Sequence, residues 1–171
     1  NMLHGSKLGI DLTEKIEGEP GYEKESDVQD PNPDLPSSKK VIEIFKEVRA
    51  CKVLELQSQR SVMLVALEKT GPHEGKQFIQ SFFEKAELST IDIVMVLEGH
   101  VELGNISTVM WKFFNNLAPK RDFYFHEGRL GIDVTQKFSE EGYQQNWPEE
   151  IEMSSEIKSQ VDKKWPHLFK E

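Results

Sequence analysis

Two continuous apolar runs, SVMLVAL at residues 61–67 and TIDIVMVL at residues 90–97, limit the possible folds more than any other feature of this sequence. A strand that is apolar at nearly every position is typically covered on both faces, as in a parallel sheet. Between the runs, apolar residues at helical spacing predict a helix over about residues 74–86. A strand, a helix and a second strand with short connections indicate a parallel sheet covered by helices.

Further segments extend this pattern. The expected elements are a helix over about 38–50, a short strand over 52–57 that forms a hairpin with 61–67, a helix over about 106–117, a third parallel strand over 121–126, and a last helix opened by Ser154 or Ser155. The predicted fold is therefore α/β, with a mixed, mainly parallel sheet between helices in three layers, and a C-terminal helix. The apolar stripe of that last helix is narrow, so we expect it to pack on an edge or on a neighbouring subunit.

Composition excludes several classes of function. The net charge of −9 disfavours nucleic acid and anionic membranes as partners. No apolar run approaches the ~20 residues that span a bilayer, and no basic-then-apolar pattern predicts a signal peptide. The single Cys51 cannot form an internal disulfide. We therefore expect a cytoplasmic protein. The first forty residues are acidic and rich in Pro, and such a stretch buries too little apolar surface to order itself.

Two loops follow the predicted parallel strands and hold candidate ligand-binding side chains. The loop TGPHEGKQF contains His73 and Lys76, but it lacks the spacing and the Ser or Thr of a Walker A loop. A helix start there could still hold an anion. The loop EGHVELGN contains His100. Because open α/β sheets bind ligands at the carboxyl ends of their strands, the two histidines and nearby Glu residues could form an acid–base or metal cluster, or they could be ordinary solvated loop residues.

An octapeptide occurs twice, as LGIDLTEK at residues 8–15 and as LGIDVTQK at residues 130–137. The matches extend to a basic residue before each copy, Lys7 or Arg129, at one offset of 122 residues. In each copy an Asp, Asp11 or Asp133, precedes a Thr by two residues, and this arrangement allows local hydrogen bonds that fix a loop. The basic residue four positions before the Asp could pair with it. Two interpretations stay open: a structural tie at the end of a sheet, or a charged group at the rim of a pocket.

The stretch GSKLGIDLTEK resembles the one that closes the C-terminal domain of UbiD-type decarboxylases, the 3-polyprenyl-4-hydroxybenzoate carboxy-lyase family. Residues 61–83 resemble that family's strand, loop and helix, and residues 91–125 resemble a following stretch in which Trp111, Pro119, Arg121 and Asp122 match. The resemblance covers about residues 61–168. Gly99 and His100 depart from it, since the family usually has acidic residues there. This chain also lacks the segment that normally precedes the Gly-Ser-Lys motif.

The resemblance implies that residues 1–37 are the end of a preceding domain and a linker, and that residues 38–171 form a second, degenerate copy of the C-terminal domain. It implies a parent enzyme that decarboxylates an aromatic acid of the quinone-precursor type, with prenylated flavin mononucleotide and a divalent metal. The family's catalytic residues and metal ligands belong to a domain with no counterpart here, so no catalytic residue, cofactor or metal site is expected in this chain. We expect a structural region that contacts the remainder of its own chain and forms homo-oligomers through the last helix. The alternatives are a small anion- or ligand-binding domain and a partner-docking module.

Overall fold

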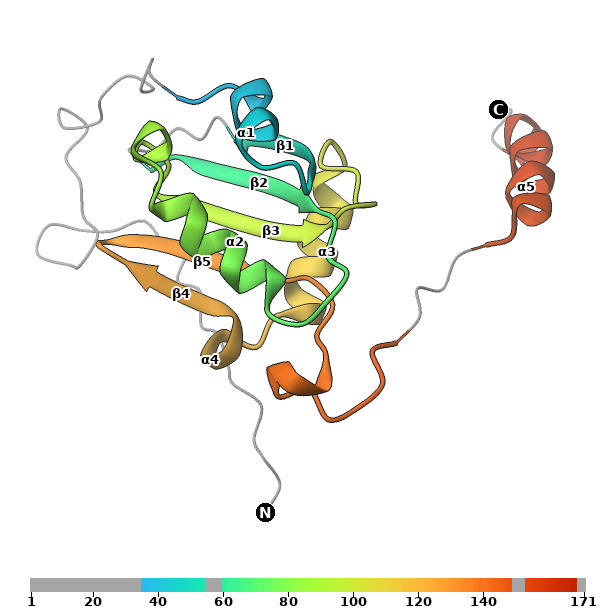
Figure 1. Ribbon diagram of the computed structural model, residues 1–171. Helices are drawn as coiled ribbons and strands as arrows, with labels where there is room; N and C mark the ends of the chain where they lie inside the picture. The colour runs from blue at the N-terminus through green and yellow to red at the C-terminus, as the bar shows by residue number, and fades with distance from the viewer. Residues whose placement is uncertain (1–34, 55–59, 149–152, 169–171) are drawn as a thin grey trace, which may run out of the picture.

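The computed structural model describes residues 35–54, 60–148 and 153–168, with side chains up to residue 165. Its centre is a five-stranded sheet in the order β1-β2-β3-β5-β4 (Figure 1). The strands are β1 (Val48–Leu54), β2 (Val62–Leu67), β3 (Ile93–Glu98), β4 (Phe123–His126) and β5 (Arg129–Asp133). The helices are α1 (Ser38–Ile44), α2 (Glu74–Phe83), η2 (Ala86–Leu88), α3 (Ile106–Asn116), α4 (Pro119–Asp122), η3 (Ser139–Glu141) and α5 (Ser155–Leu168).

The two apolar runs of the sequence form the middle of the sheet. Every residue of β2 is buried, and the four central residues of β3 are buried as well. These two strands pair in parallel, from Val62 opposite Ile93 to Leu67 opposite Glu98. Successive side chains of a strand point to opposite faces of the sheet. A strand that is buried on both faces therefore needs apolar side chains at odd and at even positions. The runs therefore identified the central strands correctly.

Helices cover both faces of the sheet, so the expected three-layer α/β fold is confirmed (Figure 1). On one face, α1 and α2 enclose a core in which Phe45, Phe78 and Phe82 lie ring against ring. On the other face, α3 supplies Val109 and Phe113 to a second core. The sheet is mixed: β2, β3 and β5 are parallel, and an antiparallel strand lies at each edge.

The third parallel strand is not the predicted one. Part of the segment 121–126 belongs to the helical turn α4, and the rest is β4, an edge strand antiparallel to β5. The parallel neighbour of β3 is β5, which the octapeptide itself forms. The two-residue turn Glu127–Gly128 joins β4 and β5, and both its residues have positive φ (47° and 78°), as in a type I′ hairpin. Both segments are apolar, and only β5 reaches the buried interior.

The first helix is shorter than expected. α1 ends at Ile44, and Val48, which continues its apolar spacing, is the first residue of β1. Val41, Phe45 and Val48 still enter one core. The register of β1 against β2 shifts between Val48 and Ala50, so Val48 lies in the same core as Cys51, whereas Ala50 packs in the other core. The antiparallel pairing of the predicted hairpin is confirmed, although its first strand begins earlier than expected, at Val48, and residues 55–59, which include the end of the predicted strand, lie outside the described residues. The helix predicted over 74–86 also ends early, at Phe83.

Gly131 allows α2 to pack directly on β5. A Cβ atom at this position would collide with the side chain of Ile79, which is fully buried on α2. Any larger residue would push the helix away from the sheet. The glycine of the octapeptide is therefore required by close approach, and not by an unusual backbone angle.

The last helix, α5, begins at the predicted place, because the Ser154 hydroxyl accepts a hydrogen bond from the Ile157 N–H at 3.3 Å. Figure 1 shows α5 standing apart from the sheet and its helices. Every residue from Met153 to Trp165 is exposed, including its apolar members. Among the described residues, no helix has the length and apolar character that would let it cross a membrane.

Replacing Gly131 with Ala should destabilise the fold by about 1–3 kcal/mol, because the added methyl group overpacks the contact between α2 and β5. Ile79→Ala removes the opposing side chain, so the double variant Gly131→Ala/Ile79→Ala should lose less than the sum of the two single losses. Urea unfolding measures all three. Gly104→Ala is the control, since a Cβ there meets only Glu102 at 3.9 Å. If the stability losses of the two single variants add up to that of the double variant, the contact between Gly131 and Ile79 does not limit the packing of α2 on β5.

Candidate functional site

The carboxyl ends of the three parallel strands meet at one edge of the sheet, which is where open α/β sheets bind ligands. Glu68 and Lys69 follow β2, Glu98 closes β3, and Asp133 closes β5. Two features lie at this edge: a buried cluster of charged side chains at β5, and an open hollow between the ends of β2 and β3.

The buried cluster begins with Asp133, which folds the chain after β5 onto itself. Its Oδ1 accepts hydrogen bonds from the Thr135 N–H at 3.1 Å and from the Thr135 hydroxyl at 2.5 Å. These are the local bonds that the Asp-x-Thr spacing predicted. Both side chains are buried, so each needs the other as a partner. The structural-tie interpretation of the octapeptide accounts for this geometry.

Lys137 completes the cluster from the last position of the octapeptide. Its side chain is only 2 % exposed, and its Nζ lies 2.9 Å from Asp133 Oδ1. It also donates to the carbonyl oxygens of Asp133 at 2.9 Å and Thr135 at 2.8 Å. A second carboxylate, that of Asp122, lies 3.9 Å away and is itself held by the Arg121 guanidinium at 2.6 Å. Buried charges are tolerated when they are paired and hydrogen-bonded in this way.

A second buried ion pair fixes the segment after the octapeptide. Lys69 Nζ lies 2.8 Å from the Glu141 carboxylate, and both side chains are nearly inaccessible. Lys69 also donates to the Gln136 carbonyl at 2.7 Å, while Glu141 accepts from the Phe138 N–H at 2.9 Å. This pair connects the end of β2 to η3, more than sixty residues later in the chain.

The charges in this cluster affect one another. Burial lowers the pKa of Lys137, and the nearby carboxylates of Asp133 and Asp122 oppose that effect. Burial also raises the pKa of Tyr124 to about 12, and the same two carboxylates and Glu141 add to the rise.

The start of α2 already holds two carboxylates of the chain. The side chain of Asp133 packs against Gly75, where a Cβ atom would collide with it, and its Oδ2 has no hydrogen-bond partner among the described residues. Glu74 folds back and accepts from the Thr70 N–H at 2.6 Å, which lowers the pKa of Glu74. Negative groups are stabilised at a helix N-terminus. Because the protein supplies them itself, this geometry disfavours an external anion at the loop that holds His73 and Lys76.

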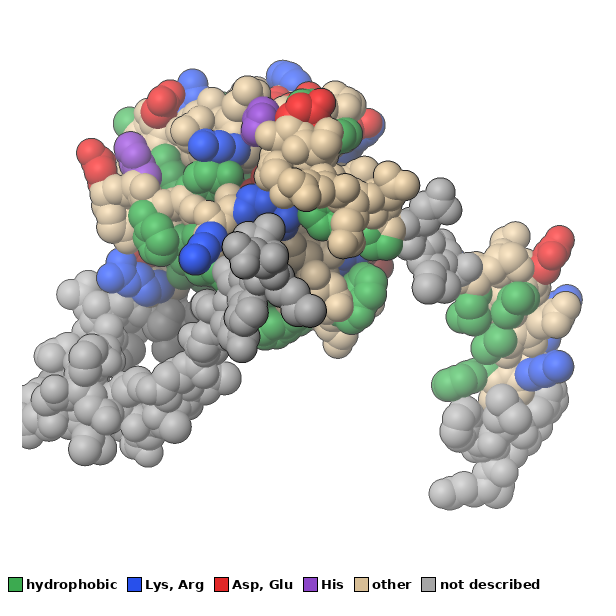
Figure 2. All heavy atoms as spheres, turned by 90° about the horizontal axis from the view of Figure 1, so that it is seen from below, with side chains coloured by type: hydrophobic (Ala, Val, Ile, Leu, Met, Phe, Trp, Pro, Cys, Tyr) green, Lys and Arg blue, Asp and Glu red, His purple; other side chains and the backbone are tan. Residues whose placement is uncertain are grey.

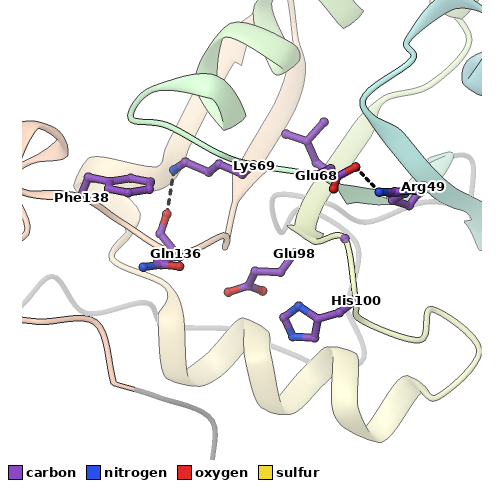
Figure 3. A pocket seen from close by; sticks show the side chains of 9 residues that line it. Arg49, Glu68, Lys69, Glu98, His100, Gln136 and Phe138 are labelled. Carbon is purple, nitrogen blue, oxygen red and sulfur yellow. Dashed lines mark hydrogen bonds and ion pairs between the residues drawn. The ribbon is translucent and has the colours of Figure 1, made fainter.

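The hollow between β2 and β3 has a volume of about 430 Å³ (Figure 3). Its lining residues are Arg49, Leu67, Glu68, Lys69, Glu98, Gly99, His100, Gln136 and Phe138. Arg49 is paired with Glu68 at 2.5 Å, and Lys69 lies 5.4 Å from the centre of the Phe138 ring. Glu98 Oε2 is buried without a hydrogen-bond partner, although Lys112 Nζ approaches to 4.0 Å. Two cations and two carboxylates thus share this surface.

The structure separates the candidate residues of the sequence. His100 lines the hollow, whereas His73 precedes α2 in a left-handed conformation (φ 65°) and does not line it. Lys76 lies over the Tyr124 ring at 5.2 Å. Asp133 is in the buried cluster. Lys7 and Asp11 lie outside the described residues. No group of three or more His, Cys, Asp or Glu side chains in the described parts of the chain could hold a metal ion.

Arg129 does not pair with Asp133. The two residues stand at opposite ends of β5, about 13 Å apart along an extended strand. The Arg129 guanidinium instead donates to the Phe83 carbonyl at 2.6 Å and stacks over the Phe83 ring at 4.5 Å. It therefore caps the carboxyl end of α2, where a cation is favoured. The partner of Asp133 is Lys137, four residues after it.

Sequence reasoning missed Lys69 and Glu141, and it did not give a role to Lys137. A signal for Lys137 was present, because the Lys recurs at the same place in both octapeptides. Lys69 and Glu141 carry no such signal. Their pairing depends on a contact between distant segments, which the spacing of residues along the chain does not encode.

Replacing Lys137 with Met should cost about 3–5 kcal/mol of stability, because Asp133 would keep a buried charge without its cation, while Asp122 would keep its pair with Arg121. Lys137→Met/Asp133→Asn should recover part of that loss by removing one uncompensated charge. Lys120→Met, on the exposed side of α4, is the matched control and should change stability by less than about 0.5 kcal/mol. Denaturant unfolding at neutral pH gives the comparison, and a loss below about 1 kcal/mol for Lys137→Met would contradict the assigned role.

Comparison with known proteins gives matches to relatives of unassigned function. An uncharacterized protein of Archaeoglobus fulgidus is 29 % identical over 125 residues, which cover 63 % of this chain and 26 % of that protein. An uncharacterized protein of Aquifex aeolicus is 28 % identical over 120 residues, covering 61 % and 25 %. The chain thus spans about a quarter of the length of the curated relatives that it matches.

Solved structures share the fold. The vanillic acid decarboxylase of Sedimentibacter hydroxybenzoicus, in its open form, superposes with a TM-score of 0.60 at 16 % identity, over 78 % of this chain and 32 % of that one. An evolved dimeric form of the UbiD-class enzyme HmfF from Pelotomaculum thermopropionicum, in complex with prFMN, gives 0.54 at 19 % identity, over 70 % and 26 %.

The sequence also matches a protein family over residues 34–144, well over half of the chain. The matched segment begins just before α1 and includes the whole sheet, the buried cluster and the hollow. The chain belongs to the family of the 3-octaprenyl-4-hydroxybenzoate carboxy-lyase C-terminal domain, as its resemblance to UbiD-type decarboxylases implied.

Proposed function

We propose that this chain is a non-catalytic, associating region of a UbiD-like carboxy-lyase that acts on an aromatic acid of the ubiquinone- or menaquinone-precursor type in the cytoplasm. The observation that carries the proposal is that the charged side chains of the buried cluster at the sheet edge are paired with one another. Asp133, Lys137, Asp122, Lys69 and Glu141 are buried and bonded to one another or to the backbone. Groups committed to structural contacts in this way are not available to bind or activate a substrate.

The octapeptide supports the proposed division of the chain. The structure assigns a role to Gly131, Asp133, Thr135 and Lys137, and the first copy has the same residue types at residues 9, 11, 13 and 15. A stretch with these four residues fits the end of another domain of this fold. We therefore propose that residues 1–37 contain the end of a preceding copy and an acidic linker, and that residues 38–171 are the second copy.

The charges at the hollow support the proposal that this domain does not hold the cofactor of the family. A flavin mononucleotide presents a phosphate, but the two basic groups at the hollow, Arg49 and Lys69, are each paired with a carboxylate. Glu68 and Glu98 add negative charge to the same surface. UbiD-class neighbours were solved with prFMN and with FMN. We propose that the parent enzyme carries prenylated flavin mononucleotide and a divalent metal in a part of the protein other than this domain.

The partners that we propose are the remainder of the decarboxylase chain and a second copy of the same protein. The exposed apolar side of α5, with Ile157 at 49 % and Trp165 at 57 % exposure, supports association through this helix. Apolar helix faces are normally buried against another surface.

One observation favours a second candidate function, a small ligand-binding domain. Glu98 presents a buried carboxylate oxygen without a hydrogen-bond partner at the hollow. Such a group is stabilised by a donor such as an amine or hydroxyl of a ligand. The negative charge of this carboxylate disfavours an anion as the ligand.

Titration of the isolated chain with flavin mononucleotide should give no saturable binding at micromolar concentrations, because paired cations do not hold a phosphate. Calorimetry or quenching of flavin fluorescence measures the binding. An equal titration with inorganic phosphate tests the loop of His73 and Lys76 separately. Saturable micromolar binding of either compound would contradict the non-catalytic assignment and favour the ligand-binding alternative.

Ending the chain after Ser154 should convert an oligomer into a monomer, because α5 is removed and the sheet with its helices stays complete. Sedimentation equilibrium of the full and shortened chains gives the mass of each. Phe125→Gln is the control for a general effect of exposed apolar groups, since Phe125 is 77 % exposed on the edge strand β4. A full chain that is already monomeric, or an unchanged assembly after truncation, would overturn the proposal that α5 joins the subunits.

A further inference from the structure

The hollow between the carboxyl ends of β2 and β3 has no part in the association proposed for α5. That association uses the apolar side chains of α5, which Figure 2 shows gathered along one side of the helix. The hollow lies where open α/β sheets bind small molecules, at the carboxyl edge of the strands. Its volume of about 430 Å³ falls in the range of about 300–1,000 Å³ that is usual for ligand pockets. The side chains around it therefore indicate what it can bind.

Glu98 supplies a carboxylate oxygen that lacks a hydrogen-bond donor. Its Oε2 is buried and accepts no hydrogen bond from the described residues. Lys112 Nζ lies 4.0 Å away, which is within reach of an ion pair but too far for a hydrogen bond. The charge of Glu98 is thus compensated by Lys112, whereas the oxygen still needs a donor. A neutral donor meets that need without adding a further charge.

The Glu98 side chain is accessible from the hollow. It is 13 % exposed, and Figure 3 shows its carboxylate directed into the space between Gln136 and His100. The last torsion of a Glu side chain is soft and roughly two-fold, so rotation about it exchanges the two oxygens. Either oxygen can therefore face a ligand while the other stays toward Lys112.

The charges around the hollow are already balanced. An anionic ligand would meet the carboxylates of Glu68 and Glu98, and each nearby cation is held by a carboxylate. A cationic ligand would compete with the buried Lys112 for Glu98 and weaken that pair. Both cases cost free energy, so a ligand without net charge is favoured. The three ion pairs at or beside the hollow are Arg49 with Glu68 at 2.5 Å, Lys69 with Glu141 at 2.8 Å, and Lys112 with Glu98 at 4.0 Å.

The uncharged polar side chains of the hollow suit hydroxyl groups. Gln136 and His100 are exposed and line the hollow, and Figure 3 shows Glu98 between them. An amide both donates and accepts hydrogen bonds, and so does a neutral imidazole. A hydroxyl group does the same, and it can therefore pair with each of them and with the carboxylate. Leu67 and Phe138 add apolar surface, on which the C–H groups of a ring can pack.

We propose that the hollow binds a neutral polyhydroxylated molecule of monosaccharide size. Glu98 accepts a hydrogen bond from one hydroxyl group of the ligand, and Gln136 and His100 bind others. The proposal assigns a ligand class to the second candidate function, the small ligand-binding domain. No bond is formed or broken, so the proposal is compatible with a non-catalytic chain, and it does not depend on association through α5.

Sugars that share one ring and differ in charge test the ligand class. Glucose is neutral, glucosamine carries an ammonium group and glucuronate carries a carboxylate, while myo-inositol adds a second neutral ring. Nuclear magnetic resonance spectra of the full chain follow each titration through the backbone amide signals. At least one neutral compound should bind saturably with a millimolar dissociation constant and shift the signals of residues 98–100 and 136–138. Glucosamine and glucuronate should each bind at least about tenfold more weakly than the tighter neutral compound.

Variants at the hollow test the assigned contacts. Glu98→Gln should weaken binding of the tighter neutral compound at least about tenfold, because a hydrogen bond to a charged acceptor is lost. Gln136→Ala and His100→Ala should each weaken it by about threefold or more. Both of these side chains are exposed, so the two Ala variants keep the fold and test the site independently of the stability of Glu98→Gln.

The matched controls are Gln80→Ala and His126→Ala. Both side chains are exposed and neither lines the hollow, so these variants should bind the neutral compound like the wild type. Circular dichroism of every variant separates a loss of binding from a loss of folding.

Absence of saturable binding by both neutral compounds would overturn the inference, and so would binding that all three variants at the hollow leave unchanged. Tighter binding of glucosamine or glucuronate than of the neutral compounds would show that the ligand is charged, which would also overturn it. The proposed function is tested separately, by the flavin titration and by the removal of α5, so it can stand where this inference fails.

Discussion

The packing of α2 on β5 is the constraint on which the rest of the structure depends. Gly131 removes the side chain that would hold the helix away, and Ile79 fills the space. Two residues later, Asp133 lies against the first turn of the same helix, at Gly75. One short strand therefore sets both the distance and the axial position of α2. Because β5 also pairs with β3 and β4, the position of α2 is fixed relative to both neighbouring strands.

The ion pair of Asp133 and Lys137 is the chemical part of the same constraint. It is buried, and the Lys side chain reaches back to the carbonyls of its own turn. Removing one member would leave an unpaired charge in the interior. In the intact pair, the attraction between the two charges and their hydrogen bonds offset the cost of desolvating them. This account gives the octapeptide a structural purpose, and it is the reason why we propose that the same residue types near the start of the chain close the preceding copy of the domain.

The proposed function rests on how the side chains at this sheet edge are engaged. In many α/β proteins the carboxyl ends of the strands hold a ligand. Here the acids and bases at β5 are engaged with one another, and the hollow between β2 and β3 has mixed charge with Arg49 and Lys69 already paired. The surface that stays open to partners is apolar and lies on α3 and α5. The paired charges at the sheet edge and the exposed apolar side chains on these helices are the two observations on which we base the proposal of an associating region.

The sequence by itself determined the class of fold, the two central strands, the start of α5 at Ser154 and the local bonds of Asp133 with Thr135. Each depends on residues close together in the chain or on a continuous apolar run, and these leave a periodic signal. Only the tertiary structure decided which apolar segment lies beside β3. The sequences of β4 and β5 are both apolar, and only their burial in the structure distinguishes them. It also decided that Arg129 caps α2, that Lys69 pairs with Glu141, and that only part of the apolar face of α3 is buried. These features depend on contacts between segments that lie far apart in the chain. The spacing of residues along the sequence does not predict such contacts.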